Sequence, residues 1–292
     1  MTKTLNQRFP GKTSGDPLVI TSFVLVFSLC FGIIGATDTY AQNNPRLMIS
    51  GSTTVLPLTQ SAGEIYLKTH PNLHLSVSGT GTGEGIKSLL DGNIDMAGAS
   101  RDLLPAEVQR AQSLNVTLNR HLLALDSLAV IVHPQNPLTD LSLLTLHQIY
   151  IGKIHNWSEI GGENRPIIAI NRDSSSGTFE MWLHLVLRGE HYRRDAQVQP
   201  SSGGVAFAVG GNKNALGYIG VGFLTPKVKV LTVDGVKPEP ENVLNHTYPL
   251  SRELYLFTRD PIPSEAVEFL TFLETQTGRN LISQEGFIPP PR

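Results

Sequence analysis

An arginine and a cluster of hydroxyl side chains stand directly before a helix-like pattern in the middle of the chain. Residues 171–178 contain Arg172, Ser176, Gly177 and Thr178, and apolar side chains then recur at helical spacing up to Leu187. This periodicity predicts a helix that begins near Ser176 and packs one face inward. The first N–H groups of a helix lack internal partners and carry partial positive charge, so this motif favours an anionic ligand.

Each polar residue of this motif has a property that suits an oxyanion. Arg172 offers a planar charged fork, Ser176 and Thr178 offer rotatable hydroxyl donors, and Gly177 lets the backbone come close. For this motif taken alone, the alternative is an ordinary serine-capped helix with a surface arginine.

The same order of strand, hydroxyl-rich turn and helix occurs twice more. Residues 50–55, with Thr53 and Thr54, follow an apolar stretch and precede a helix-like pattern. Residues 78–85, with Thr82, follow an alternating strand-like segment and lead into another helix-like pattern. Hydroxyl residues cap many helices, so each copy is weak evidence. Three copies together favour one shared anion site.

Other chemistries fit these residues less well. Ile86 occupies the position of the P-loop glycine before Lys87, and Glu84 occupies a required glycine of the dinucleotide fingerprint. The nine histidines lack the spacing of a zinc site, so we expect no metal. An exported serine hydrolase or phosphatase that uses Ser174, Ser175 or Ser176 is an alternative of a different class, but the segment lacks the Gly-x-Ser-x-Gly and Ser-x-x-Lys patterns.

The first 41 residues have the pattern of an export signal peptide, with cleavage expected after Ala41. Three basic residues precede an apolar run over residues 18–36, and polar residues follow it. An uncleaved membrane anchor is the alternative, although small residues after the run favour cleavage. The only cysteine, Cys30, follows Leu29, which argues against lipid attachment. We therefore expect a cysteine-free mature protein in the periplasm or another extracytoplasmic space.

The charge of the chain gives no indication of a nucleic-acid partner. The formal charge is −2 for all 292 residues, and the leader carries +1, which leaves −3 for the remainder. A mildly acidic protein that binds an anion must hold it through local dipoles and a few donors.

The residues after the leader indicate an α/β fold. About 250 residues exceed one common domain and fit two lobes. Strand-like and helix-like segments alternate, as in largely parallel sheets, whose ligands lie at the carboxyl ends of the strands. We expect strands at 94–99, 128–132, 166–170, 217–220 and 254–257, a helix after Pro105, and a hairpin or excursion over 233–246.

Several motifs, taken together and in this order, resemble those of phosphate-specific solute-binding proteins of ABC importers. The resemblance extends from about Arg46 to the C-terminal end. It rests on residues 50–55, 79–87, 99–101, 149–157, 172–178, 215–220 and 248–250.

The resemblance implies a two-lobed periplasmic-binding-protein fold of type II, with two chain crossings between the lobes. It implies lobe I from residues 45–128 with 252–292, and lobe II from residues 129–251. The implied function is to capture inorganic phosphate in the cleft and deliver it to a membrane ABC permease, as a monomer without enzymatic activity or cofactor. The implied phosphate ligands are Thr53, Thr54, Thr82, Arg101, Arg172, Ser176, Gly177 and Thr178.

Arg101 departs from the pattern of the better-known members of this family. They have an aspartate at this position, which accepts the proton that distinguishes hydrogen phosphate from sulfate. Arg101 either donates to the anion or points outward and pairs with Asp102. Arg172 also lacks an aspartate two residues on, and Asp173 or Glu180 is the expected substitute. A binding protein for sulfate, molybdate or tungstate is therefore an alternative.

Overall fold

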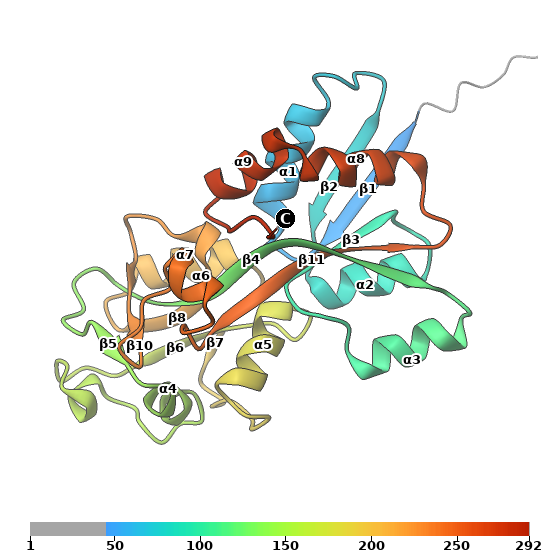
Figure 1. The fold of residues 1–292 in the computed structure, drawn as a ribbon. Helices are drawn as coiled ribbons and strands as arrows, with labels where there is room; N and C mark the ends of the chain where they lie inside the picture. The colour runs from blue at the N-terminus through green and yellow to red at the C-terminus, as the bar shows by residue number, and fades with distance from the viewer. Residues whose placement is uncertain (1–44, 292) are drawn as a thin grey trace, which may run out of the picture. The chain divides into compact units, whose positions relative to one another are not determined.

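The computed structural model describes residues 45–291, so the predicted leader, residues 1–41, lies outside the described residues. The main feature of the described residues is a nine-stranded sheet (Figure 1). Its strands follow the order β2-β1-β3-β11-β4-β8-β6-β7, and β9 pairs with β4. A second, two-stranded sheet joins β5 to β10.

Two long strands form the middle of the large sheet. β4 pairs antiparallel with β11 over residues 118–127 and with β8 over residues 128–132. β4 therefore changes its partner between Ser127 and Leu128 and belongs to both halves of the sheet. On either side of β4 and β11 the sheet is parallel, as predicted: β1 pairs with β2 and β3, and β6 pairs with β7 and β8.

The first half of the sheet carries helices on both faces. Along β11, Leu254 and Leu256 belong to one core cluster, while Tyr255 and Phe257 belong to another. This alternation shows that the two clusters lie on opposite faces. The elements of this half are β1 (Arg46–Gly51), α1 (Leu56–Tyr66), β2 (His74–Gly79), α2 (Thr82–Leu90), β3 (Met96–Ala99), α3 (Pro105–Ser113), β4 (Leu118–Val132), β11 (Ser251–Arg259), α8 (Ser264–Glu274) and α9 (Gln276–Gln284).

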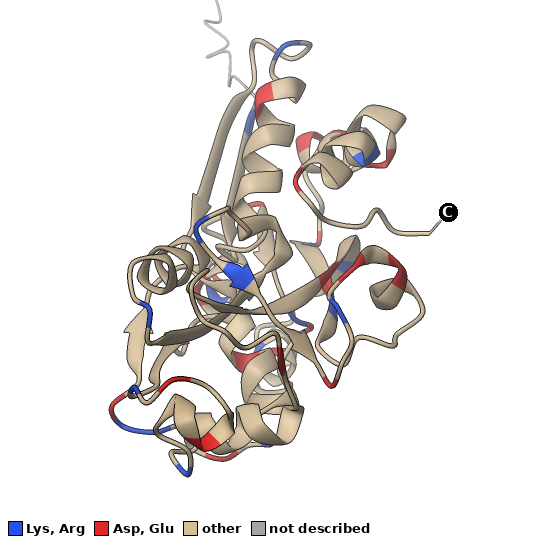
Figure 2. Ribbon diagram, turned by 90° about the vertical axis from the view of Figure 1, so that its left-hand side faces the viewer, with Lys and Arg blue, Asp and Glu red and all other residues tan. Residues whose placement is uncertain are grey.

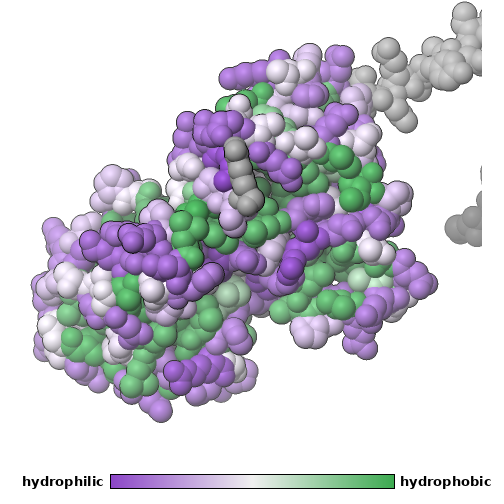
Figure 3. All heavy atoms as spheres, in the orientation of Figure 1, coloured by the Kyte–Doolittle hydropathy of each residue, from purple (hydrophilic) through white to green (hydrophobic). Residues whose placement is uncertain are grey.

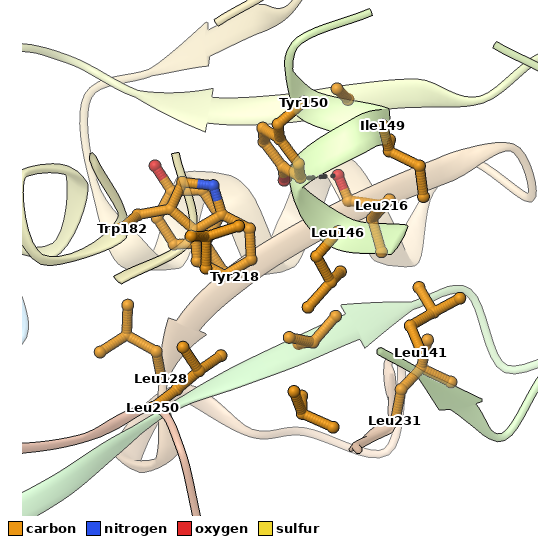
Figure 4. Packing of buried hydrophobic residues seen from close by; sticks show 14 of the residues in the cluster. Leu128, Leu141, Leu146, Ile149, Tyr150, Trp182, Leu216, Tyr218, Leu231 and Leu250 are labelled. Carbon is orange, nitrogen blue, oxygen red and sulfur yellow. Dashed lines mark hydrogen bonds between the residues drawn. The ribbon is translucent and has the colours of Figure 1, made fainter. Parts of the chain in front are cut away.

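The second half repeats the alternation along the end of β4, where Val130 and Ile131 face different clusters. Its largest cluster contains Trp182, which stacks on Tyr218 at 4.0 Å between ring centroids, with Tyr150 edge-on to both rings (Figure 4). The elements here are β5 (Asp140–Leu141), α4 (Leu143–Tyr150), η1 (Trp157–Ile160), β6 (Ile168–Arg172), α5 (Gly177–Leu185), β7 (Gln197–Gln199), α6 (Ser202–Gly210), β8 (Ala215–Gly220), η2 (Val221–Phe223), β9 (Lys229–Val230), β10 (Thr232–Val233) and α7 (Pro240–Leu244).

The predicted elements are present, but several bounds differ: β3 begins at Met96 rather than at residue 94, and β6 covers Ile168–Arg172 rather than residues 166–170. The strand expected at 128–132 is the end of β4, which begins at Leu118 because its earlier residues pair with β11. The helix expected through Leu187 ends at Leu185, and Leu187 is buried just beyond it. Residues 233–246 form a tight turn with positive φ at Asp234, followed by the short helix α7.

Figures 2 and 3 show how charged and hydrophobic residues are distributed over the described part of the chain. Acidic and basic residues are interspersed along the ribbon in Figure 2, and hydrophilic residues break up the hydrophobic patches of the face in Figure 3. Within residues 45–291, every helix is too short or too polar to cross a bilayer.

Candidate functional site

The turn after β1 places the first two hydroxyl groups. Gly51 adopts φ +137°, and a Cβ there would lie 2.2 Å from the carbonyl oxygen of Gly98, so only glycine fits this close approach. The turn then leads into α1 through Thr53 and Thr54, which are both buried. Thr54 has no exposed surface, and its hydroxyl needs polar partners within the protein.

Those partners come from residues more than a hundred positions away. The Oγ1 atom of Thr54 lies 3.0 Å from Oγ1 of Thr178, at the start of α5. It also lies 3.3 Å from Oγ of Ser202, at the start of α6, whose backbone N–H donates to Oγ1 of Thr53 at 3.4 Å. The N-terminal ends of α1, α5 and α6 therefore meet at these hydroxyls.

The second predicted turn joins the same group through Thr82, the first residue of α2. Its Oγ1 accepts the backbone N–H of Ser100 at 3.2 Å and lies 3.3 Å from Oγ of Ser100. Gly177, the first residue of α5, packs against both residues, because a Cβ on it would lie 2.5 Å from Oγ1 of Thr82 and 2.8 Å from Oγ of Ser100. Glycine at this position therefore lets the N-termini of α2 and α5 approach each other.

The third predicted turn lies between β6 and α5. Ser176 is the N-cap of α5, and its Oγ accepts the backbone N–H of Phe179 at 3.2 Å. Arg172, at the end of β6, is 1% exposed and donates to the carbonyl oxygens of Gln199 and Pro200 at 3.1 and 3.2 Å.

Arg172 also reaches the start of α6 and a carboxylate. It lies 3.3 Å from Oγ of Ser202 and 3.3 Å from Oδ2 of Asp173. Burial lowers the pKa of Arg172, and the nearby Asp173 carboxylate opposes this shift. Asp173 is thus the substitute partner, since Glu180 pairs elsewhere.

The structure therefore brings seven of the eight predicted residues into one buried polar group, which we call the hydroxyl cluster. It consists of Thr53, Thr54, Thr82, Arg172, Ser176, Gly177 and Thr178, together with Ser100, Ser202 and Arg252, which the sequence analysis missed.

A recognisable signal precedes Ser202. Ser201 and Ser202 stand at the start of an apolar helix, which is the same hydroxyl-rich helix start as in the other motifs. Ser201 is the N-cap of α6, and its Oγ accepts the backbone N–H of Gly204 at 3.0 Å. This fourth copy could have been predicted from the sequence.

Arg252 had no such signal. It lies on β11, opposite Asp126 on β4, and the two strands are more than a hundred residues apart in the sequence. Its Nε donates to Oδ2 of Asp126 at 2.7 Å, and its Nη1 donates to Oγ1 of Thr178 at 2.9 Å. Burial raises the pKa of the Asp126 carboxyl, while the ion pair with Arg252 acts in the opposite direction.

Arg101 is the one predicted residue that is not in the hydroxyl cluster. Its Nη1 and Nη2 atoms donate to the two carboxylate oxygens of Glu107 at 2.7 and 2.8 Å. Its Nε pairs with Glu180 on α5. The expected pairing with Asp102 is also wrong, because Asp102 offers Arg101 only its carbonyl oxygen and its carboxylate pairs with Arg120.

Two carboxylates hold Arg101 outside the hydroxyl cluster. Both Glu107 and Glu180 hold its guanidinium, and two negative charges beside it would repel a second anion. Burial raises the pKa of Glu180, and the hydrogen bond from Arg101 lowers it. The pair of Arg101 and Glu180 links the loop after β3 to α5.

No metal or nucleophile chemistry is evident in this region. The described residues contain no group of three or more His, Cys, Asp or Glu side chains arranged to hold a metal. The hydroxyl of Ser175 pairs with Asp173, and that of Ser176 caps α5. Among the described residues, the hydrogen-bond partners of Ser175 and Ser176 include no histidine.

Comparison with known proteins identifies a matching family model and several similar proteins. A family model described as a PBP superfamily domain matches residues 36–276. The phosphate-binding protein PstS of Bacillus subtilis is 30% identical over 282 residues, which cover 93% of this chain and 92% of that protein. The PstS protein of Borreliella burgdorferi is 28% identical and covers 93% of this chain and 98% of that protein.

Solved structures lead to the same family. A Clostridium perfringens protein with bound phosphate, assigned as a phosphate ABC transporter substrate-binding protein, has a TM-score of 0.80 and 32% identity, and covers 84% of this chain and 100% of that chain. An ABC-type phosphate transport receptor from Vibrio cholerae has a TM-score of 0.69 and 33% identity, with the same coverage. These matches confirm the two-lobed periplasmic-binding-protein fold and a binding protein rather than an enzyme. The chain belongs to the PBP superfamily and, within it, to the family of the phosphate-binding proteins PstS.

Proposed function

We propose that this protein binds inorganic phosphate at the hydroxyl cluster and delivers it to the membrane permease of an ABC importer. The observation that carries the proposal is the convergence of four helix N-termini, those of α1, α2, α5 and α6, on a buried group rich in hydroxyl and guanidinium donors. The phosphate-binding names of the relatives point to the same ligand.

The donors of the cluster match the needs of a small tetrahedral anion. An anion that leaves water loses its hydration shell, so aimed N–H and O–H groups must replace each lost contact. Hydroxyl side chains, backbone N–H groups of helix starts and Arg172 supply such groups here. The helix dipoles add positive potential without a mobile counterion.

The lobe boundaries support binding by closure. β4 leaves β11 for β8 at Leu128, which agrees with lobe I at residues 45–128 with 252–292 and lobe II at residues 129–251. Contacts between these regions include the N–H of Gly83, which donates to the carbonyl oxygen of Ser175 at 2.9 Å, and the pair of Arg101 with Glu180. We propose that the two regions close around phosphate and that the permease recognises the closed form.

The expected location follows from this role. A binding protein that feeds an importer acts outside the cytoplasm, which agrees with the export signal predicted for residues 1–41. We further propose that the protein acts as a monomer, since one chain contains all the donors of the cluster.

Calorimetric titration of the purified, phosphate-free protein with inorganic phosphate tests the proposed function. We expect one binding event per chain, accompanied by a change in the small-angle scattering profile. Competition by sulfate, molybdate and tungstate should be weaker than competition by unlabelled phosphate. A protein that ignores phosphate, or that prefers one of the other oxyanions, would contradict the proposal, and an unchanged scattering profile would contradict closure alone.

A further inference from the structure

A buried ion pair lies directly behind the hydroxyl cluster. Asp126 and Arg252 face each other on β4 and β11, and their side chains are 0% and 1% exposed. A hydrogen bond from Nε of Arg252 to Oδ2 of Asp126, 2.7 Å long, joins them, and the Nη2 atom forms an ion pair with the same oxygen at 2.6 Å. Burying two charges is costly, and apolar side chains in place of a buried ion pair often give the same or a higher stability. The pair therefore invites a functional explanation.

The surroundings hold this pair in one position. The second oxygen of Asp126 accepts the backbone N–H of Val221 at 3.1 Å. Gly220 leaves room for the guanidinium, because a Cβ there would lie 2.9 Å from Nη2 of Arg252 and 2.7 Å from Cγ2 of Thr54. Three strands, β4, β8 and β11, thus fix the direction in which Arg252 points.

Arg252 points at hydroxyls from two separate turns. Its Nη1 donates to Oγ1 of Thr178 at 2.9 Å, and its Nη2 lies 3.5 Å from Oγ1 of Thr54. An arginine can only donate, so each hydroxyl must accept from it through a lone pair. Because the two hydroxyls also lie 3.0 Å apart, one of them donates to the other, and the hydrogen of the second points away from the arginine, as donation to an anion requires.

We propose that Arg252, held by Asp126, is a positioning residue of the anion site: it fixes the hydroxyls of Thr54 and Thr178 as donors and places a positive charge behind them. This inference rests on the proposed phosphate binding. Arg252 would then be the second arginine of the site, beside Arg172. Arg101 does not take this place because it pairs with the carboxylates of Glu107 and Glu180.

A double-mutant cycle with inorganic phosphate tests this role. Arg252→Met and Thr178→Val should each weaken binding about tenfold or more, as measured by calorimetry. If Arg252 acts through the hydroxyl of Thr178, the two effects should not multiply, because the same hydroxyl donor can be lost only once. The Kd of the double variant should then exceed the larger of the two single-variant Kd values by no more than about threefold. A loss through general destabilisation would instead multiply the two effects, and that result would overturn the inference.

Arg193→Met is the matched control. The Arg193 side chain is 8% exposed and forms two hydrogen bonds of 2.6 Å with Asp195, which is not a residue of the hydroxyl cluster. The Arg193→Met variant should bind phosphate with the affinity of the wild type.

Arg252→Lys keeps the inference testable if Arg252→Met does not fold. A lysine keeps the charge beside Asp126, but its single ammonium lacks the fork that reaches both hydroxyls. We expect Arg252→Lys to bind phosphate more weakly than the wild type, and its effect on Kd should again not multiply with that of Thr178→Val. Wild-type affinity of Arg252→Lys would overturn the inference. A wild-type protein that does not bind phosphate would refute the proposed function itself, whereas multiplicative effects in a protein that does bind would refute only the role of Arg252.

Discussion

Thr82→Val is the most direct perturbation of the hydroxyl cluster. It replaces a hydroxyl with a methyl group of similar size at a side chain that is fully buried. In the wild type, Oγ1 of Thr82 accepts the backbone N–H of Ser100 at 3.2 Å and lies 3.3 Å from Oγ of Ser100. The substitution therefore removes a polar partner with little change of shape.

Two separate costs follow from this geometry. An orphaned N–H of Ser100 should lower the free energy of unfolding by about 1–3 kcal/mol. Loss of a donor to the anion should weaken phosphate binding by at least about 1.5 kcal/mol, which is roughly tenfold in Kd. Urea unfolding of the phosphate-free protein measures the first cost, and calorimetric titration measures the second.

Thr59→Val is the matched control for this experiment. Thr59 is 2% exposed, and its hydroxyl donates to the carbonyl oxygens of Val55 and Leu56 within α1. The carbonyl of Val55 also accepts the backbone N–H of Thr59 at 3.1 Å, so loss of the Thr59 hydroxyl does not leave this carbonyl without a donor. We expect a stability loss of about 1 kcal/mol at most and unchanged phosphate affinity. A folded Thr82→Val protein with wild-type affinity would refute the assignment of the hydroxyl cluster.

Three further predictions concern the same site. Arg172→Ala should weaken phosphate binding by at least about 1.5 kcal/mol and lower the free energy of unfolding by about 2 kcal/mol, because the carbonyl groups of Gln199 and Pro200 lose a charged donor; titration and urea unfolding check both values, and an unaffected Kd would contradict its role. Gly177→Ala should weaken binding about tenfold or more, since its Cβ would lie 2.5 Å from Oγ1 of Thr82, whereas Gly203→Ala has no neighbour closer than 3.8 Å and should bind as the wild type does. The Asp126 carboxylate accepts hydrogen bonds from Arg252 and from a backbone N–H, so we expect the anion to meet mainly donors. Phosphate should therefore bind more tightly near pH 8, where the dianion prevails, than near pH 6, and sulfate should compete measurably. Complete exclusion of sulfate in a competition assay would show that a proton acceptor is present.

The sequence allowed the local parts of the fold to be predicted because short-range signals determine them. β8 is a short apolar run, and the helix α3 begins at Pro105, a residue typical of the first helical position. The long pairing of β4 with β11 could not be predicted, since it joins residues that are more than a hundred positions apart and no local signal specifies the partner.

The same distinction applies to the candidate site. The hydroxyl residues at the starts of α2 and α5 were predicted from motifs that each lie within a few residues. Arg252 was missed because an arginine on an apolar strand acquires meaning only when the fold brings Asp126 opposite to it. The partners of Arg101 were not predicted for a similar reason: Glu107 and Glu180 come from two different helices, and only the tertiary structure shows that they both hold its guanidinium.

The stacked pair of Trp182 and Tyr218 gives the protein a built-in optical reporter. Trp182 lies one helical turn after Thr178 on α5, has no exposed surface, and is parallel to the Tyr218 ring within 1°. The other tryptophan, Trp157, donates its indole N–H to the carbonyl oxygen of Asn214. Emission from Trp182 should therefore be quenched or shifted by any small rotation of α5, so that occupancy by a colourless ion can be followed in real time without a label.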